Sequence, residues 1–276
     1  MGHSRKSSQT GRIDATSNAR STLFIGSTEK AFMVLHAFDG ASRYMTLGDI
    51  AKAAGLDRSS TQRLVHTLEV LGYLWRVPCT REYGLTSKLL HFSYNYIRSH
   101  ELIDKGSPYL LDVSLRLGET TNLFELDGHE IVLVSRYPGK HICNIDFAVG
   151  SRLPAFYTAS GLAILSRLPE KRVLEILHQT PLVPMTPYTQ TDPTKLIEGV
   201  KSAANRGYAV TENQTVLGHI SISAPITDHT GAPVAAINIS LPTSRCSIER
   251  AETELAQHVQ VAATSISKAR PLTLPR

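Results

Sequence analysis

Residues 46–77 constrain the fold more than any other stretch of this chain. Thr46, with Asp49 three positions later, forms an acidic version of the capping box and predicts a helix directly after it. Gly55 supplies a turn, and Asp57 is suited to cap the next helix. Two short strands are expected to follow. This order of elements is typical of a winged helix-turn-helix, which places its second helix in the major groove of DNA.

The second of these helices, expected from Asp57 to about Leu71, has two distinct faces. Its core-facing positions recur at helical spacing: Thr61, Leu64, Leu68 and Leu71. Its polar face carries Ser59, Gln62, Arg63 and His66, and Arg58 and Ser60 in its first turn complete the candidate DNA-contacting residues. Arginine can bond guanine and glutamine can bond adenine in bidentate fashion, and short hydroxyls allow close approach to phosphates. The alternative is the solvated face of an ordinary helix, which the neighbouring helix, turn and wing disfavour.

The wing is expected over residues 74–77 and 82–85, where Arg76 and Arg81 could meet the DNA backbone or minor groove. A first helix is expected to begin with Ser27 as its cap. These patterns divide the chain into a flexible basic arm (1–26), a winged helix-turn-helix (27–86), a linker helix (87–100), a second domain (101–270) and a tail (271–276). The apolar stripe of the linker helix suits either dimer packing or docking on its own domain.

The second domain is predicted to be α+β. Predicted strands 121–126 and 130–137 flank Asp127-Gly128, which is a strong hairpin signal. A third strand is expected over 141–147, and further strands over 208–211, 219–226 and 233–240. A helix is expected to start at Ser107-Pro108, with Leu111 and Leu115 facing inward. Strands that return through tight turns imply an antiparallel sheet with helices packed on it.

Length and composition limit the class of protein to which this chain can belong. A length of 276 residues suggests two domains, and three cysteines argue against a disulfide framework and for a reducing cytoplasm. The net charge of +5 is mild evidence for a nucleic-acid partner, although residues 27–86 are almost neutral. No apolar run reaches the roughly 20 residues of a membrane span, and no signal peptide is visible. We therefore expect a cytoplasmic protein with no membrane partner.

Catalytic and metal sites find little support in the sequence. His141 and Cys143 would lie on opposite faces of one strand, so they could not easily share an ion. His219 is a weak metal candidate. The chain has no phosphate-binding glycine loop and no nucleophile elbow. We expect no enzyme activity, no metal and no cofactor.

Taken together, the two halves resemble the IclR family of bacterial transcriptional regulators over about residues 27–270. The resemblance is carried at the amino-terminal end by residues 27–31, 47–51, 61–64 and 68–73. At the carboxy-terminal end it is carried by residues 149–154, 158–161, 206–209, 217–218, 224–225 and 235–240. The resemblance implies a GAF-like effector domain, a homodimer or tetramer on palindromic operator DNA, and a small-molecule effector that changes DNA affinity.

The resemblance also implies an effector pocket made by Phe147, Tyr157, Ala159, Ser160, Glu212, Ser221, Asn238 and Ser240. The start of the helix after Thr158 would present backbone N–H groups to a carboxylate. Glu212 is awkward there, since it would repel an anion. As alternatives, Asn238 and Ser240 could lie on the sheet surface, Glu212 could be exposed to solvent, and Phe147 could be plain core.

We therefore expect a ligand-responsive regulator. The leading hypothesis is a repressor of a catabolic operon that responds to a small carboxylate or semialdehyde. The alternatives are an activator of an aromatic-acid catabolic operon, an enzyme with a DNA-targeting module, and a constitutive architectural protein.

Overall fold

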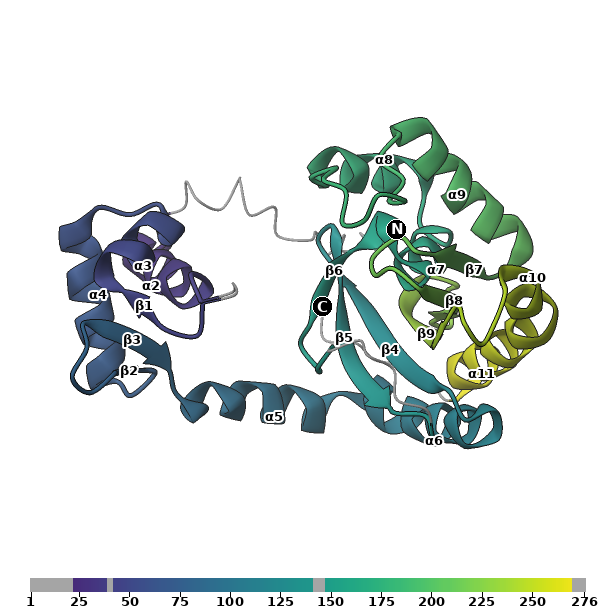
Figure 1. Ribbon diagram of the computed structural model, residues 1–276, viewed down its shortest axis with the longest axis horizontal. Helices are drawn as coiled ribbons and strands as arrows, with labels where there is room; N and C mark the ends of the chain where they lie inside the picture. The colour runs from purple at the N-terminus through teal and green to yellow at the C-terminus, as the bar shows by residue number, and fades with distance from the viewer. Residues whose placement is uncertain (1–21, 39–41, 141–146, 270–276) are drawn as a thin grey trace, which may run out of the picture. The chain divides into compact units, whose positions relative to one another are not determined.

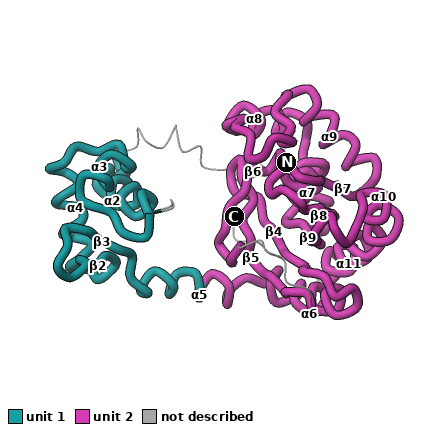
Figure 2. The backbone as a smooth tube through the Cα atoms, viewed as in Figure 1, with its two compact units in different colours: residues 1–95, 276 teal, residues 96–275 magenta. Residues whose placement is uncertain are grey.

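The computed structural model describes residues 22–38, 42–140 and 147–269 (Figure 1). The chain divides into two units, residues 1–95 with residue 276, and residues 96–275 (Figure 2). Each unit has its own hydrophobic core, and we describe the units separately.

Unit 1 is a three-helix fold with a small antiparallel sheet. Its elements are α2 (Gly26–His36), β1 (Met45–Thr46), α3 (Leu47–Ala54), α4 (Arg58–Val70), β2 (Leu74–Arg76), β3 (Glu82–Leu85), η1 (Ser87–Leu89) and the start of α5 (Leu90–Ser99). The strands are ordered β1-β3-β2, and β2 and β3 form the wing. The core of unit 1 is small and consists of Val34, Ile50, Val65, Leu68 and Leu74. The predicted winged helix-turn-helix is confirmed.

Local capping explains where the helices of unit 1 begin. The Thr46 side chain accepts from the backbone N–H of Asp49, and the Asp49 side chain accepts from that of Thr46, so the predicted capping box is formed. Gly55 ends α3 in the left-handed region at φ 63°, which is the reason that glycine suits this position. Asp57 caps α4 by accepting from the Ser60 N–H at 2.8 Å.

Two details of this unit differ from the prediction. Leu71 is 50% exposed, because α4 ends at Val70 and the chain turns away at Gly72, whose φ is 77°. Val65, which is 1% exposed, fills the core instead. The first helix begins at Gly26 with Ile25 at its N-cap, so Ser27 lies inside the first turn and does not cap it.

Unit 2 is an antiparallel six-stranded sheet covered on both faces by helices (Figure 1). Its strands are β4 (Thr120–Asp127), β5 (Glu130–Tyr137), β6 (Arg152–Pro154), β7 (Ala209–Glu212), β8 (His219–Thr227) and β9 (Pro233–Pro242), in the order β6-β5-β4-β9-β8-β7. Its larger helices are α6 (Glu101–Leu117), α7 (Ala159–Leu165), α8 (Glu170–Gln179), α9 (Pro193–Arg206) and α11 (Ala256–Lys268). Shorter helical segments are η2 (Ala155–Tyr157), α10 (Ile248–Arg250) and the π-helical η3 (Ala251–Leu255). The predicted α+β class is confirmed.

The two faces of this sheet have different characters. On one face, side chains such as Leu123, Ile237 and Ile239 pack with α6 and α11 in a mainly apolar core. On the other face, α7 packs against β8 and β9, and polar side chains alternate with the apolar ones along the strands. Because successive strand residues point to opposite faces, this second face carries Asn122, Asn238 and Ser240.

The helix predicted from Ser107 begins earlier, at Glu101, and Pro108 lies inside it. Leu111 and Leu115 are 43% and 62% exposed, so the predicted inward face was wrong. Leu102, Leu110 and Val113 are buried in their place. Of the predicted strand over 141–147, only Phe147 belongs to the described residues. The predicted placement of His141 and Cys143 on opposite faces of that strand falls outside the described residues.

Candidate DNA-binding face and effector cavity

The polar face of α4 is open to solvent. Arg58, Ser59, Gln62, Arg63 and His66 are exposed, and Ser60 is half-buried. The opposite face of the helix holds Thr61, Val65 and Leu68 in the core of unit 1. The helix therefore presents side chains that can read base edges while its other face is anchored.

Asp57 caps the beginning of α4 as predicted, and it also engages the Ser59 side chain. Asp57 holds the Ser60 N–H and also accepts from the Ser59 hydroxyl at 2.7 Å. These hydrogen bonds, those of Ser60 first, hold the pKa of the Asp57 carboxyl well below its usual range. A phosphate at this helix end would meet a fixed negative charge. This geometry favours Arg58 and Arg63 over Ser59 and Ser60 as the DNA contacts of the helix.

The wing carries two exposed arginines at different places. Arg76 ends β2 and pairs in register with Tyr83, whereas Arg81 lies in the turn between the strands. Lys88, which the sequence analysis did not single out, has a structural role. Its Nζ donates to the Leu71 carbonyl at 2.7 Å and lies 4.8 Å from the centre of the Tyr73 ring, so it ties η1 to the end of α4.

A small cavity opens on the polar face of the sheet in unit 2. Its walls are Asn122, Phe124, Ile131, Arg136, Phe147, Leu153, Thr158, Ala159, Ser160, Thr211, Gln214, Thr215, His219, Ser221, Asn238 and Ser240. Its volume is about 40 Å³. Six of the eight predicted effector residues line it: Phe147, Ala159, Ser160, Ser221, Asn238 and Ser240.

The floor of the cavity is built by cross-strand pairing. Asn122 on β4 pairs in register with Arg136 on β5 and with Asn238 on β9, so these three side chains form one row. Two positions along β9, Ser240 pairs with Ser221 on β8 and begins a second row. Directly paired residues share a face of the sheet and lie about 5 Å apart, which brings all of these polar groups together.

Hydrogen bonds fix much of this floor. Asn122 Nδ2 donates to Asn238 Oδ1 at 3.0 Å, and Asn238 Nδ2 donates to the Ile222 carbonyl at 3.4 Å. The Ser221 and Ser240 hydroxyls lie 3.4 Å apart. Asn122, Asn238 and Ser240 are all buried, so these groups are shielded from bulk water. The cavity therefore combines fixed polar groups with apolar side chains such as Phe124 and Leu153, and convergent polar groups of this kind can orient a small polar ligand.

Two predicted pocket residues lie outside the walls. Tyr157 is 1% exposed and belongs to the apolar core under α7, where burial raises the pKa of its phenol. Glu212 is half-buried at the end of β7 and pairs with Ile220. The absence of Glu212 from the walls removes the repulsion that made it awkward beside an anion.

The beginning of α7 is also a poorer anion site than predicted. This helix spans only seven residues, and the Thr158 hydroxyl already accepts from the Gly161 N–H at 3.0 Å. The positive charge in the cavity wall comes instead from Arg136, which the sequence analysis missed.

The cavity wall also includes Asn122, Thr211, Gln214 and Thr215, which were not predicted, and His219, which the sequence offered only as a weak metal candidate. Burial lowers the pKa of His219 from 6.5, partly opposed by its bond to the Leu241 backbone, and so favours the neutral imidazole. Alternation along β4 and β5 could have pointed to the face of Asn122 and Arg136, but their pairing partners come from distant parts of the chain.

Neither a metal site nor a membrane-spanning helix occurs among residues 22–38, 42–140 and 147–269. Within these ranges, no three histidine, cysteine or acidic side chains form a group that could hold a metal ion. No helix in this part of the chain is long and apolar enough to cross a membrane.

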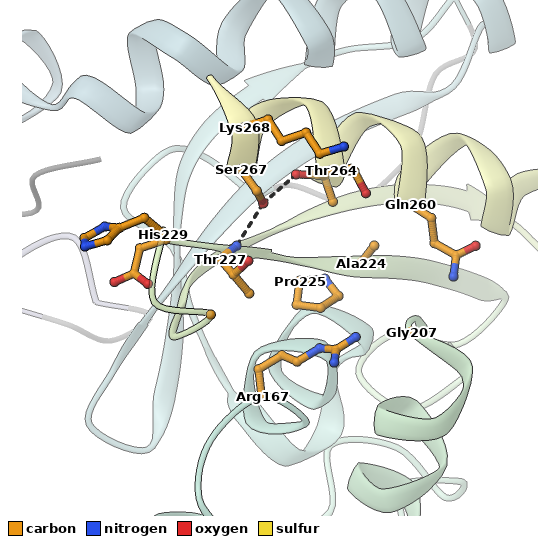
Figure 3. Close-up of a pocket in the computed structure, with 13 residues that line it drawn as sticks. Arg167, Gly207, Ala224, Pro225, Thr227, His229, Gln260, Thr264, Ser267 and Lys268 are labelled. Atoms are coloured by element: carbon orange, nitrogen blue, oxygen red, sulfur yellow. Dashed lines mark hydrogen bonds between the residues drawn. The ribbon is translucent and has the colours of Figure 1, made fainter. Parts of the chain in front are cut away.

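A larger open groove of about 590 Å³ lies between α11 and the β8–β9 turn (Figure 3). The Thr227 N–H donates to Ser267 Oγ at 3.0 Å across its floor. Arg167 lies two residues after the end of α7 and Lys268 is the last residue of α11, so both lie near helix ends where cations offset the partial negative charge of helix carbonyls. The groove is more open to solvent than the smaller cavity, which therefore remains the candidate ligand site.

Comparison with known proteins assigns both units. The model of the IclR helix-turn-helix domain matches residues 27–78, and that of the bacterial transcriptional regulator IclR C-terminal domain matches residues 94–268. The chain belongs to the IclR family. Its domains and curated relatives are those of DNA-binding transcriptional regulators, so this IclR protein is a regulator rather than an enzyme.

Individual relatives support this assignment. The Pca regulon regulatory protein of Pseudomonas putida is 30% identical over 232 residues, which are 84% of this chain and 78% of the relative. The crystal structure of Thermotoga maritima IclR is 28% identical with a TM-score of 0.65, covering 88% of this chain and 98% of that one. An IclR homologue from Microbacterium hydrocarbonoxydans, solved in complex with 4-hydroxybenzoate, shares the fold at 23% identity and a TM-score of 0.70, covering 87% and 97%.

Proposed function

We propose that this IclR protein is a repressor of a catabolic operon that responds to a small carboxylic acid. In this proposal, copies of unit 1 bind the two halves of a palindromic operator as a homodimer or a pair of dimers. Unit 2 binds the effector, and the bound effector lowers the affinity for DNA. An activator of an aromatic-acid operon is the alternative, since the direction of control is not encoded in either site.

The charge of the cavity wall is the main support for a carboxylate effector. Arg136 is a cation, His219 is held neutral by burial, and no aspartate or glutamate belongs to the described wall. The remaining polar groups are amides and hydroxyls. An arginine in a shielded site pairs with a carboxylate through two parallel hydrogen bonds. Solved IclR-family chains include one in complex with 4-hydroxybenzoate, which is also a carboxylate.

The proposed link between the two sites is differential affinity. A ligand shifts an equilibrium only as far as its affinities for the two states differ, and the coupling is reciprocal. DNA should therefore weaken effector binding by the same factor by which the effector weakens DNA binding. This reciprocity separates a true regulator from a constitutive DNA-binding protein.

The test is a gel-shift titration of the full chain on the DNA upstream of its own gene, with and without small acids and semialdehydes. A repressor is expected to bind this DNA tightly and to lose affinity when an acid is added. Tighter binding with the acid would favour the activator. Recovery of the acid unchanged after incubation is expected, and turnover of the acid would contradict a purely regulatory role.

A further inference from the structure

One buried amide oxygen in the cavity wall lacks a partner. Asn122 is 3% exposed, and its Oδ1 is buried without a hydrogen bond. Buried polar atoms in folded proteins are almost always paired, by protein, water or ligand. The same side chain lines the cavity, so its free acceptor is available to whatever occupies that space.

The neighbouring amide of Asn238 determines which atom of the Asn122 side chain has no hydrogen-bond partner. Asn238 donates its Nδ2 to the Ile222 carbonyl, which turns its Oδ1 toward Asn122. Asn122 must therefore present its Nδ2 to Asn238, and its Oδ1 is the remaining atom. A carbonyl oxygen can only accept. The missing partner is therefore an O–H or N–H donor, which a ligand in the cavity can supply.

The charge beside this acceptor selects an anion. Arg136 pairs in register with Asn122 on the adjacent strand, and both side chains line the cavity. Directly paired residues have Cβ atoms about 5 Å apart, so a ligand a few atoms long can reach both groups. One end of that ligand would be a carboxylate on Arg136 and another group would be the donor to Asn122.

The size of the cavity limits the rest of the ligand. A volume of about 40 Å³ holds the equivalent of about three water molecules, since one water needs roughly 10–15 Å³ in this measure. A short aliphatic chain fits this space with small adjustments of the walls. An aromatic ring would require larger movements of side chains such as Phe124 or Phe147.

We propose that the effector is a short-chain hydroxy acid, whose carboxylate pairs with Arg136 and whose hydroxyl donates to Oδ1 of Asn122. This inference rests on the proposed function, because it names the effector of the same cavity. An acid without the hydroxyl, or an oxo acid, has no donor and leaves the Asn122 oxygen unpaired. Asn122 is then the residue that determines specificity between these acids.

The test measures binding of matched acids to the full chain by calorimetry. The pairs are glycolate and acetate, lactate and propionate, and 3-hydroxybutyrate and butyrate, with pyruvate as the oxo acid. At least one hydroxy acid is expected to bind tenfold or more tightly than its partner acid, and lactate more tightly than pyruvate. This preference is measured on the unmodified protein, so a variant that fails to fold does not affect it.

Two variants then test whether Asn122 causes the preference for hydroxy acids. Asn122→Leu is expected to reduce it to less than about threefold. Thr121→Val is the matched control, because Thr121 is equally buried on the same strand, donates to the Leu110 carbonyl at 2.8 Å and is absent from the cavity wall. This control is expected to keep the full preference. An unchanged preference in a folded Asn122→Leu protein would overturn the role of Asn122.

The outcomes separate this inference from the proposed function. If acids bind and release DNA without any preference for a hydroxyl, the inference fails and the proposed function stands. If a hydroxy acid binds preferentially but leaves operator affinity unchanged, the specificity assigned to Asn122 stands, but the acid is not an effector and the proposed function fails. If no short-chain acid binds a protein that still binds DNA, the inference is overturned, and the effector class of the proposed function must be sought among larger acids.

Discussion

The Tyr96 hydroxyl donates a 2.5 Å hydrogen bond to Glu125 Oε2, while the other carboxylate oxygen of Glu125 lies 3.2 Å from His100 Nε2. Tyr96 belongs to α5, His100 is the N-cap of α6, and Glu125 lies on β4 three residues after Asn122. Burial raises the pKa of Glu125, opposed by the bond from Tyr96 and the charge of His100. This cluster therefore joins the end of the linker helix to the strand that lines the cavity.

Replacement of Tyr96 tests that connection. Tyr96→Phe removes the donor but keeps the ring, and should lower the free energy of unfolding of unit 2 by about 1 kcal/mol. It should also reduce the effect of an acid on operator affinity. Both are measured on the full chain, by urea unfolding and by DNA titration. Tyr188→Phe, at an exposed tyrosine away from the cluster, is the control. An unchanged response to the acid in Tyr96→Phe would exclude the cluster from the coupling.

Arg63 is expected to read a base. Arg63→Ala should weaken binding to the specific operator by about 1–3 kcal/mol and relax the preference at one base position. Arg116→Ala removes an equally exposed arginine from unit 2, whose partner is Asp112, and should leave operator binding unchanged. Fluorescence anisotropy with operator variants measures both effects. An Arg63→Ala protein with full operator affinity would refute base reading by this residue.

Arg76 in the wing is expected to contact phosphate rather than a base. Arg76→Ala should weaken specific and non-specific DNA about equally and lower the slope of log affinity against log salt by about 1. The measurement is a salt titration on both kinds of DNA. A loss confined to the operator would assign Arg76 to base reading instead.

Gly161 is required by a close approach of backbone. A Cβ at this position would lie 2.0 Å from the Ala155 carbonyl oxygen, so Gly161→Ala should lower the free energy of unfolding by about 3 kcal/mol or more. Gly199→Ala in α9 is the matched control, since its Cβ would meet nothing closer than 3.8 Å. That substitution should stabilise the helix by about 0.5–1 kcal/mol. Thermal unfolding distinguishes the two, and equal effects would contradict the close approach.

The pH dependence of stability should carry a contribution from His219. Its pKa is lowered on folding, so the unfolded chain takes up a proton first as the pH falls. The stabilising contribution is therefore complete above about pH 6.5 and is lost as the pH falls through the folded pKa. His219→Gln should flatten the curve of unfolding free energy against pH below 6.5. An identical slope in the variant would assign the acid sensitivity to other groups.

Local signals account for what the sequence could predict. The Thr46 capping box, the Asp57 and Thr158 caps and the turn at Gly128 each involve residues within three or four positions of one another. Such contacts depend only on residues that are close together in the sequence. They were sufficient for the winged helix-turn-helix and for the hairpin of β4 and β5.

The missed features depend on contacts between distant residues. Arg136 and Asn122 enter the cavity because β4 pairs with both β5 and β9, and Asn238 is 116 positions away from Asn122. The inward face of α6 was mispredicted for a related reason. Packing against α11 and β4 determines which leucines are buried, and it favours Leu110 over Leu111.

The most direct test of the central claim is the operator affinity of the full chain as the effector acid is added, compared between the parent and Arg136→Gln. The account predicts that the acid weakens operator binding of the parent by tenfold or more. It predicts no response in Arg136→Gln, which should retain its ligand-free affinity because Arg136 lies in unit 2. A variant that still releases DNA at the same acid concentration as the parent would contradict control by this cavity.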